Sequence, residues 1–361
     1  MGVEIKLTDR QFPVSPLFIE FLQQRIDGDA IDATWHDQLS ETLVNSEGER
    51  RREVAQAVAE RILDHPAGRD AIVRAYDLFT AILAGQPEKL RWFHERYRFL
   101  CIVGCPRHGG SYLTKQLFRA IGMNPDEVPN VVAHDGFPDA GPFELVDGHN
   151  TLTGMMQQTA EYLAMIEVFF ADSRLFGNRV VVPKKATKAA YHGGFFHRIH
   201  GPDTEYLITL RHPVAACIST YEKSTGLPAD GRFAVRGNIE EWARRDNLAT
   251  GEAADDIVRR EYFDVYLRYW EQYHLQLVLT GLPAGAAWQV VAYGRERMEA
   301  VAAAWFARFR SRERPEPFAV FDKRDRHPDW MRKGEQAVLR VAGMWRTVGR
   351  VYPVDEILEC W

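Results

Sequence analysis

The sequence predicts an α/β fold: a doubly wound, mainly parallel sheet flanked by helices, with a helical extension at the N-terminus. Four short apolar runs indicate buried strands, and they lie at residues 99–103, 179–183, 205–210 and 288–293. Helical patterns separate these runs, notably at 155–171 and 255–279. Strands that alternate with helices are typical of parallel sheets, because two parallel strands need a long crossover connection.

The first 95 residues contain helical patterns and no strand candidate. Apolar residues recur three and four positions apart near 16–27, 51–64 and 69–84. We therefore predict two domains, a helical N-terminal region over residues 1–95 and an α/β domain over residues 96–361. The helical region would either lie over the ligand site or form a dimer surface, and the sequence leaves both open.

Composition and charge exclude several classes of protein. The 361 residues are 46% hydrophobic and 26% charged, as in soluble globular proteins. A net charge of −5 provides no global attraction for nucleic acid or an anionic membrane. We find no signal peptide and no apolar run near the roughly 20 residues of a membrane helix. The four cysteines show neither metal spacing nor a disulfide framework, so we expect a cytoplasmic protein without a metal.

The most informative segment follows the first predicted strand. The apolar run 99–103 ends at Gly104, and Gly109 and Gly110 allow a tight turn or a close approach to a ligand. We predict Ser111 as the N-cap of the helix that follows. Such a turn directs backbone N–H groups and the positive end of a helix dipole at one point, which predicts a phosphate or sulfate site.

This loop is close to the Walker pattern, and the difference is informative. A nucleoside-triphosphatase loop reads Gly-x4-Gly-Lys-Ser/Thr, whereas this chain reads Gly104-x4-Gly109-Gly110-Ser111. We therefore expect a P-loop-like fold, but glycine stands where the phosphate-binding lysine is expected. Arg107 is the one cation inside the loop, and its planar charged group can bind an anion.

A second segment predicts a second anion site. The strand 205–210 leads into Arg211-His212-Pro213, and Ser219 follows the arginine by eight residues, two helical turns later. Both segments sit at the carboxyl ends of predicted strands. Ligands of open α/β sheets bind at that edge.

Together the two segments resemble the family of sulfotransferases that use 3′-phosphoadenosine 5′-phosphosulfate (PAPS). The first family motif is a strand followed by Pro-Arg/Lys-Ser-Gly-Thr/Ser-x-x-Leu, and here it is Pro106-Arg107-His108-Gly109-Gly110-Ser111-Tyr112-Leu113. The second is a strand, then Arg-Asn/Asp/His-Pro and a serine eight residues after the arginine. The resemblance covers roughly residues 97 to 350. It implies that the loop from Arg107 to Tyr112 binds the 5′-phosphosulfate, and that Arg211 and Ser219 bind the 3′-phosphate.

Two residues depart from the first family motif. His108 replaces the usual serine, and Gly110 replaces the usual hydroxyl residue. One side-chain donor to the phosphate is therefore missing, which predicts a lower cofactor affinity or an altered use of the donor.

The resemblance also implies the catalytic groups. Gly141-Pro142-Phe143-Glu144 resembles a Gly-x-aromatic-Glu element of many bacterial sulfotransferases, so Glu144 is our first choice for the base that takes the acceptor's proton. His134, Asp135 and Glu127 remain alternatives.

Three further positions follow from the family pattern. Lys184 or Lys185 matches a lysine that stabilises the departing oxygen. The catalytic histidine of the animal cytosolic members has no equivalent at Ala186 or Thr187, so that mechanism does not transfer. Arg332-Lys333-Gly334 resembles the late Arg-Lys-Gly element that closes on the 3′-phosphate.

The sequence thus predicts transfer of a sulfuryl group from PAPS to a hydroxyl or amine of a small-molecule acceptor, by in-line displacement and without a metal. The product nucleotide would be 3′-phosphoadenosine 5′-phosphate (PAP). Two alternatives remain open: a P-loop kinase or nucleotide-binding protein with a degenerate loop, and a catalytically inactive nucleotide-binding protein. The missing Walker lysine argues against the kinase. The acceptor and the oligomeric state, for which a homodimer is one option, are not encoded in any motif.

Overall fold

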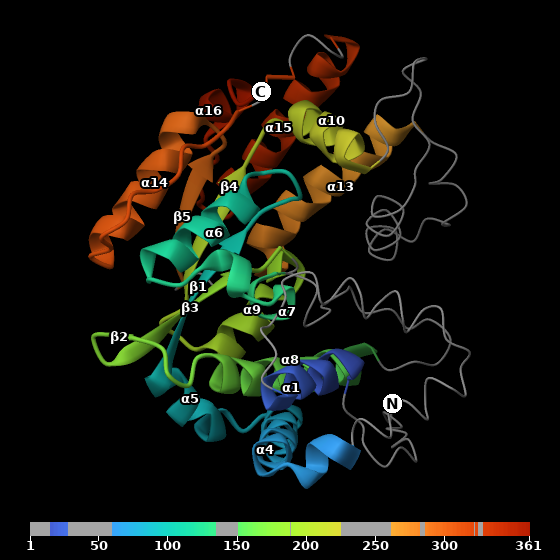
Figure 1. Ribbon diagram of the computed structural model, residues 1–361. Coiled ribbons are helices and arrows are strands. Elements are labelled where there is room, and N and C mark those ends of the chain that lie inside the picture. Colours follow the sequence, from blue (N-terminus) through green and yellow to red (C-terminus); the bar gives the residue numbers. More distant parts are fainter. Residues whose placement is uncertain are drawn as a thin grey trace, which may run out of the picture. The chain divides into compact units, whose positions relative to one another are not determined.

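The structure, a computed structural model, describes residues 15–27, 60–134, 151–187, 189–224, 261–281, 286–320, 322–323 and 328–361. Within these ranges the chain is α/β, with five strands in a mixed sheet of order β2-β3-β1-β4-β5 and helices flanking it (Figure 1). The strands are β1 (Tyr97–Val103), β2 (Leu175–Phe176), β3 (Arg179–Lys185), β4 (Glu205–Leu210) and β5 (Ala287–Ala292).

The four predicted strands and the α/β class are confirmed. Strands β1, β4 and β5 are parallel neighbours, with Val103 opposite Ile208 and Leu210 opposite Ala292. Strand β2 was not predicted, because two residues are too short for a periodic pattern, and it pairs antiparallel with β3. The sheet is therefore mixed, and the finer doubly wound, P-loop-like arrangement stays a prediction.

The chain divides into two compact units. The first unit comprises residues 1–98 and 123–184, and the second comprises residues 99–122 and 185–361. Residues 123–184 thus group with the N-terminal segment, although the sequence placed them in the α/β domain.

The described part of the first unit is mainly helical. Its longer helices are α1 (Pro16–Asp27), α4 (Pro66–Leu83) and α8 (Thr151–Phe169). Short helical segments are η1 (Pro87–Leu90), α5 (Arg91–Arg96), η2 (Pro125–Glu127) and α7 (Asn130–Ala133). Helix α4 packs along α8, and α1 contacts both helices (Figure 1). The face that α4 buries carries Ala71, Ile72, Ala75, Leu78 and Ile82, so the helix is confirmed, but the apolar residues Tyr76 and Leu83 are exposed rather than part of this face.

The second unit packs its helices around a strongly aromatic core. Its described helices are α6 (Gly110–Ala120), α9 (Ala189–His200), α10 (Pro213–Ser224), α13 (Tyr262–Gln276), α14 (Arg295–Arg308), α15 (Pro328–Thr347) and α16 (Val354–Leu358). A π-helical turn, η3 (Leu277–Gly281), extends α13. Helix α13 contacts α9, α10 and α15, and α14 contacts α6. Trp270 on α13 and Trp345 on α15 are both completely buried. This packing fixes α10, which carries part of the candidate site.

Candidate functional site

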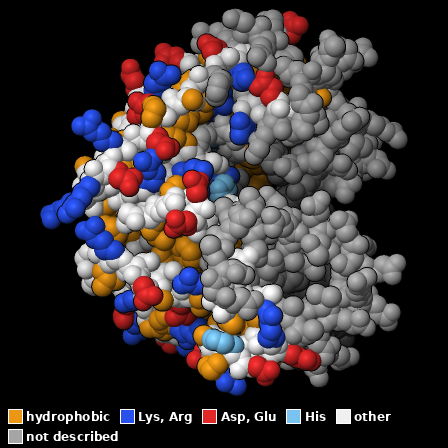
Figure 2. Space-filling model, in the orientation of Figure 1, with side chains coloured by type: hydrophobic (Ala, Val, Ile, Leu, Met, Phe, Trp, Pro, Cys, Tyr) orange, Lys and Arg blue, Asp and Glu red, His pale blue; other side chains and the backbone are white. Residues whose placement is uncertain are grey.

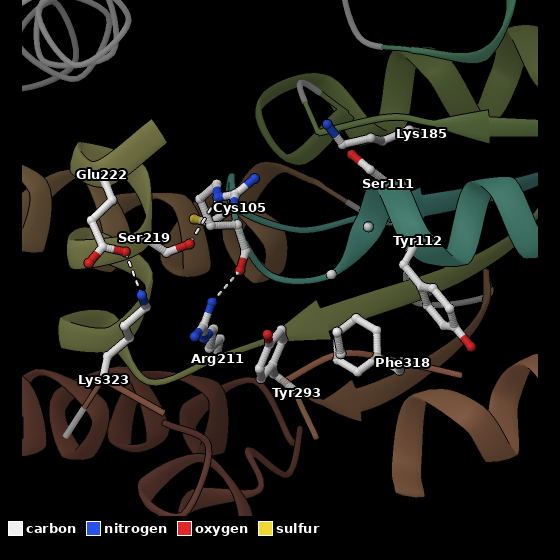
Figure 3. A pocket seen from close by; sticks show the side chains of 14 residues that line it. Cys105, Ser111, Tyr112, Lys185, Arg211, Ser219, Glu222, Tyr293, Phe318 and Lys323 are labelled. Carbon is white, nitrogen blue, oxygen red and sulfur yellow. Dashed lines mark hydrogen bonds and ion pairs between the residues drawn. The ribbon is translucent and has the colours of Figure 1, made fainter. Parts of the chain in front are cut away.

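A cavity of about 510 Å³ in the second unit lies beyond the carboxyl ends of β1 and β4 (Figure 3). Its lining includes most of the predicted ligand-binding residues, namely Arg107, Gly109, Gly110, Ser111, Tyr112, Arg211 and Ser219, together with Lys185. Residues from two predicted anion motifs therefore surround one space. A volume of this size is within the range of roughly 300–1,000 Å³ that is usual for small-molecule sites.

The loop between β1 and α6 owes its shape to two glycines. A Cβ at Gly104 would lie 1.9 Å from Thr209 Oγ1, so only glycine lets the loop pass β4 at this point. Gly109 has a left-handed φ of 88°, and a Cβ there would lie 2.9 Å from Met298 Cε. Gly109 is also the N-cap of α6, so the prediction of Ser111 as N-cap was wrong by two positions. Backbone conformation, rather than a side-chain oxygen, starts this helix.

The first turn of α6 presents backbone donors to the cavity. Gly110 and Ser111 lie in this turn and line the cavity. The first N–H groups of an α-helix have no acceptor within the helix, and the helix dipole adds positive charge there. This end of the cavity is suited to a phosphate or sulfate group.

Arg107 connects the two predicted anion motifs. Its Nε donates a hydrogen bond to Ser219 Oγ at 3.0 Å, across 112 positions of sequence. Arg211 Nη1 in turn donates to the backbone carbonyl of Arg107 at 3.0 Å. Arg107 has a φ of 67°, an uncommon conformation for a residue other than glycine. These contacts hold three predicted anion ligands in one arrangement (Figure 3).

Arg211 is a buried cation with an unused donor. Its side chain is 2% exposed and lies over the ring of Tyr293, with the guanidinium carbon 3.9 Å from the ring centroid. Burial is the main cause that lowers the pKa of Arg211; Tyr293 and Tyr266 oppose this shift, and the nearby charge of Arg107 adds to it. Among the described residues, Arg211 Nε has no hydrogen-bond partner. A buried charge with an unpaired donor is costly, and an anionic ligand would satisfy both the charge and the donor.

The adjacent lysines Lys184 and Lys185 lie in different surroundings, as successive strand residues point to opposite faces. Lys185 lines the cavity, and its Cε is 3.5 Å from the position of a Cβ on Gly110. Lys184 is 3% exposed in the first unit, where Nζ donates to the carbonyl of His134 at 2.6 Å. It also lies 4.2 Å from the ring centroid of Tyr162. Of the two lysines, Lys185 has the placement of a ligand-binding group.

The side chain of His108 is turned into the core beneath the loop. It is completely buried, and Nδ1 donates to the carbonyl of Thr209 at 3.0 Å. Its ring centroid lies 5.7 Å from that of His274. Burial is the main cause that holds the pKa of His108 well below its usual value, and the neighbouring His274 lowers it further. His108 therefore anchors the loop as a neutral core residue, which the sequence pattern had not indicated.

Only two of the four candidate bases, His134 and Glu127, lie within the described residues. Glu144 and Asp135 lie outside the described residues. His134 and Glu127 belong to the first unit, where the carbonyl of His134 accepts a hydrogen bond from Lys184. The carboxylate of Glu127 accepts a hydrogen bond of 2.9 Å from Asn124 in a surface turn.

The late basic triplet lies on α15 and is not among the residues that line the cavity. Lys333 Nζ forms an exposed ion pair with Asp264 at 2.7 Å. At Gly334 a Cβ would lie 2.8 Å from a methyl carbon of Val214, so this glycine lets α15 pack closely on α10. Gly334 therefore has a packing role between α15 and α10.

Sequence reasoning missed several residues that line the cavity. Lys323 and Glu222 form an ion pair there, and Tyr293 and Phe318 provide aromatic walls. Glu222 follows Ser219 by three residues on the same helix, so helical spacing was a usable signal. No pattern in the sequence marks Lys323.

Positive and negative side chains are interspersed over the face drawn in colour in Figure 2, so the basic residues of the cavity do not belong to a broad basic surface there. Among the described residues no group of histidine, cysteine and acidic side chains is arranged to hold a metal ion. None of the described helices has the length and apolarity needed to cross a membrane. Comparisons with models of known families, with curated proteins and with solved structures gave no match.

Proposed function

We propose that this protein is a PAPS-dependent sulfotransferase that acts on a hydroxyl or amine of a small molecule. The supporting observation is that Arg107 links the loop before α6 to Ser219, with Arg211 bound to the same residue. PAPS carries a phosphosulfate at one position and a phosphate at another, so it needs two anion subsites that face one space. Residues of both predicted motifs line one cavity, which supports this proposal.

The residues present suit such a ligand. The glycines of the loop permit close approach of a phosphosulfate to the first turn of α6. Arg211 Nε, which has no partner among the described residues, and the hydroxyl of Ser219 are donors for the 3′-phosphate. Arg107 lies between these groups, and its charge favours either anion.

The chain would promote transfer mainly through electrostatics. When bound, PAPS supplies the sulfuryl group for in-line displacement by the acceptor. Lys185 lies beside Gly110 and stabilises negative charge that develops near the loop. The α6 N–H groups and Arg107 orient the phosphosulfate, and Glu144 is the proposed base on the strength of the family resemblance.

A second candidate function deserves the same test because of Lys185. The aliphatic part of the Lys185 side chain lies beside Gly110, the position that carries lysine in a Walker loop. Strand β3 therefore provides a lysine near the place where this loop lacks one. A kinase or nucleotide-binding protein with a divided phosphate site would use Lys185 in that way.

The proposal also extends to a reducing, cytoplasmic setting, with which the four free cysteines agree.

Nucleotide titration separates these functions. We expect PAP to bind more tightly than 5′-AMP by calorimetry, because PAP alone supplies the 3′-phosphate. At a hundredfold excess over its dissociation constant, PAP should raise the unfolding free energy by about 2.7 kcal/mol. Arg211→Ala should remove the advantage of PAP over 5′-AMP. Arg340→Ala, which changes an exposed arginine on α15 that pairs with Glu271, is the control.

Each other outcome has a defined meaning. Tighter binding of ATP with magnesium than of PAP would support the kinase instead. Equal affinities for PAP and 5′-AMP would contradict the second anion subsite. If PAP binds as expected, transfer of labelled sulfate from PAPS to a panel of phenols, alcohols and amines tests catalysis.

A further inference from the structure

A carboxylate occupies the cavity close to the proposed phosphate ligands. Glu222 lies three residues after Ser219 on α10, so the two side chains share one face of the helix. Both residues line the cavity, and Figure 3 shows Glu222 beside Ser219 and facing Lys323. Glu222 is also near the C-terminal end of α10, where the helix dipole is negative. On charge alone, this wall of the cavity would repel a phosphate.

Lys323 neutralises that wall. Its Nζ pairs with Glu222 Oε2, and the lysine side chain is 10% exposed while the glutamate side chain is 24% exposed. The pair connects α10 to the segment that precedes α15. An ion pair so little exposed is screened less by water than a surface pair. Removing one partner therefore changes the charge that the other presents to the cavity.

We propose that Glu222 competes with a bound phosphate for the ammonium group of Lys323, and that this competition sets how strongly the cavity binds phosphate. In the free protein the carboxylate holds the lysine ammonium. A phosphate group at the Arg211 and Ser219 end offers more negative charge than one carboxylate, so it draws Lys323 away from Glu222. No covalent bond changes; one charge-assisted hydrogen bond replaces another. As applied to the 3′-phosphate of PAPS, this inference rests on the proposed function.

The exchange makes Glu222 a specificity-determining residue. An anion with a single charge gains little from Lys323, because it must break an existing ion pair to reach it. A phosphate dianion gains more, which favours nucleotides that carry a terminal phosphate at this end of the cavity. The cost of displacing Glu222 also keeps affinity moderate, which helps a product nucleotide to leave.

The test is a gain of affinity in Glu222→Gln. Glutamine keeps the size of the side chain and a hydrogen-bond acceptor, and it removes the competing charge. We expect PAP and inorganic phosphate each to bind about tenfold more tightly, a factor that corresponds to roughly 1.4 kcal/mol. The matched control is Glu271→Gln, which neutralises a carboxylate paired with Arg340 between α13 and α15. This control should leave both affinities unchanged.

A second variant tests the lysine. Lys323→Met should weaken the binding of both probes about tenfold, because the lysine is lost and the charge of Glu222 is no longer neutralised. Adding Glu222→Gln to Lys323→Met should recover part of this loss but should not reach the affinity of Glu222→Gln alone. A residue that only supports the fold would not increase affinity when it is replaced. The thermal midpoint of each variant shows whether the site is still folded.

Failure of this inference is distinct from failure of the proposed function. Glu222→Gln that binds neither probe more tightly than the parent protein overturns the inference, even if PAP binds and depends on Arg211. A gain for phosphate together with no preference for PAP over 5′-AMP supports the inference and overturns the sulfotransferase proposal.

Discussion

The buried ionisable groups of the two units differ in whether the protein supplies their hydrogen-bond partners. In the first unit Glu161 is 1% exposed and accepts hydrogen bonds from the backbone N–H of Ser15 and from Gln157, while Lys184 donates to backbone carbonyls. In the second unit Arg211 is equally buried, yet its Nε has no partner among the described residues. Where the protein supplies the partners, a buried charge is structural. Where a partner is lacking beside a cavity, a ligand is the expected partner.

The largest expected effect tests the cavity side of this comparison. If Lys185 stabilises developing charge, Lys185→Ala should lower kcat for sulfuryl transfer by about 10²–10³, the typical effect of losing one such group. The unfolding free energy should stay within about 0.5 kcal/mol of the parent value, as for other changes away from the core. Kinetics and urea denaturation measure the two quantities. Lys115→Ala, which changes an exposed lysine on α6, should leave both unchanged.

An acid titration tests the core beneath the cavity. Burial lowers the pKa of His274 from 6.5 to about 4, because the charged ring would lose its hydration. Between these two pKa values His274 is protonated in the unfolded chain and neutral in the folded chain. The stability contribution is fully present above pH 6.5 and is lost as the pH falls towards 4, by about 3 kcal/mol. His108, which faces His274, acts in the same direction.

Denaturation at pH 7 and at pH 4.5 measures this loss. His274→Gln, which keeps a polar side chain but cannot become charged, should show a smaller drop between the two pH values. An equal drop in both proteins would mean that other groups cause the acid sensitivity.

Glu161 in the first unit should show the opposite pH dependence. Burial raises its pKa from 4.5 to about 7, against the lowering effect of the hydrogen bonds from Ser15 and Gln157. The folded state therefore binds the proton more tightly than the unfolded state. The favourable contribution of the neutral acid is present below pH 4.5 and is lost as the pH rises through 7, by up to about 3 kcal/mol.

The variant Glu161→Gln isolates this group because it is neutral at every pH. Relative to the parent protein it should be more stable at pH 8 and nearly unchanged at pH 4.5, as measured by urea denaturation. Destabilisation of the same size at both pH values would show that packing, and not ionisation, dominates at this position.

The smallest expected effect concerns Lys184. Lys184→Met should lower the unfolding free energy by about 2 kcal/mol, because the carbonyl of His134 loses a charge-assisted hydrogen bond. Methionine keeps part of the apolar stem over Tyr162. In this variant PAP affinity should match the parent value at a temperature where both proteins are folded. A loss of affinity without a loss of stability would reverse the roles that we assign to Lys184 and Lys185.

Much of the fold was predictable because the signals are local. Continuous apolar runs marked β1, β3, β4 and β5, and helical spacing marked α1, α4 and α8. The spacing of Gly104 and Gly109 predicted a tight loop after β1, and at both positions the backbone needs a residue without a Cβ. Arg211 and Ser219 were found for a similar reason, since two helical turns separate them along one helix.

Sequence reasoning was least informative where segments far apart in the chain pack together. His108 occupies a motif position, yet its ring packs on His274 from α13. Arg332-Lys333-Gly334 matches a family element, yet Gly334 is where α15 packs against α10. Lys323 carries no motif at all, and its importance comes from Glu222, 101 positions earlier in the chain. Glu144 lies outside the described residues, so its role as base stays a prediction.

The sequence by itself determined the α/β class, the main strands and the two segments whose residues line the cavity, because strand, helix and turn preferences act within a few residues. Only the tertiary structure decided which of two adjacent lysines lines the cavity, and that a carboxylate and Lys323 join the same space. The physical reason is that a side chain's role depends on its nearest partners, and in this chain those partners come from segments about a hundred residues away.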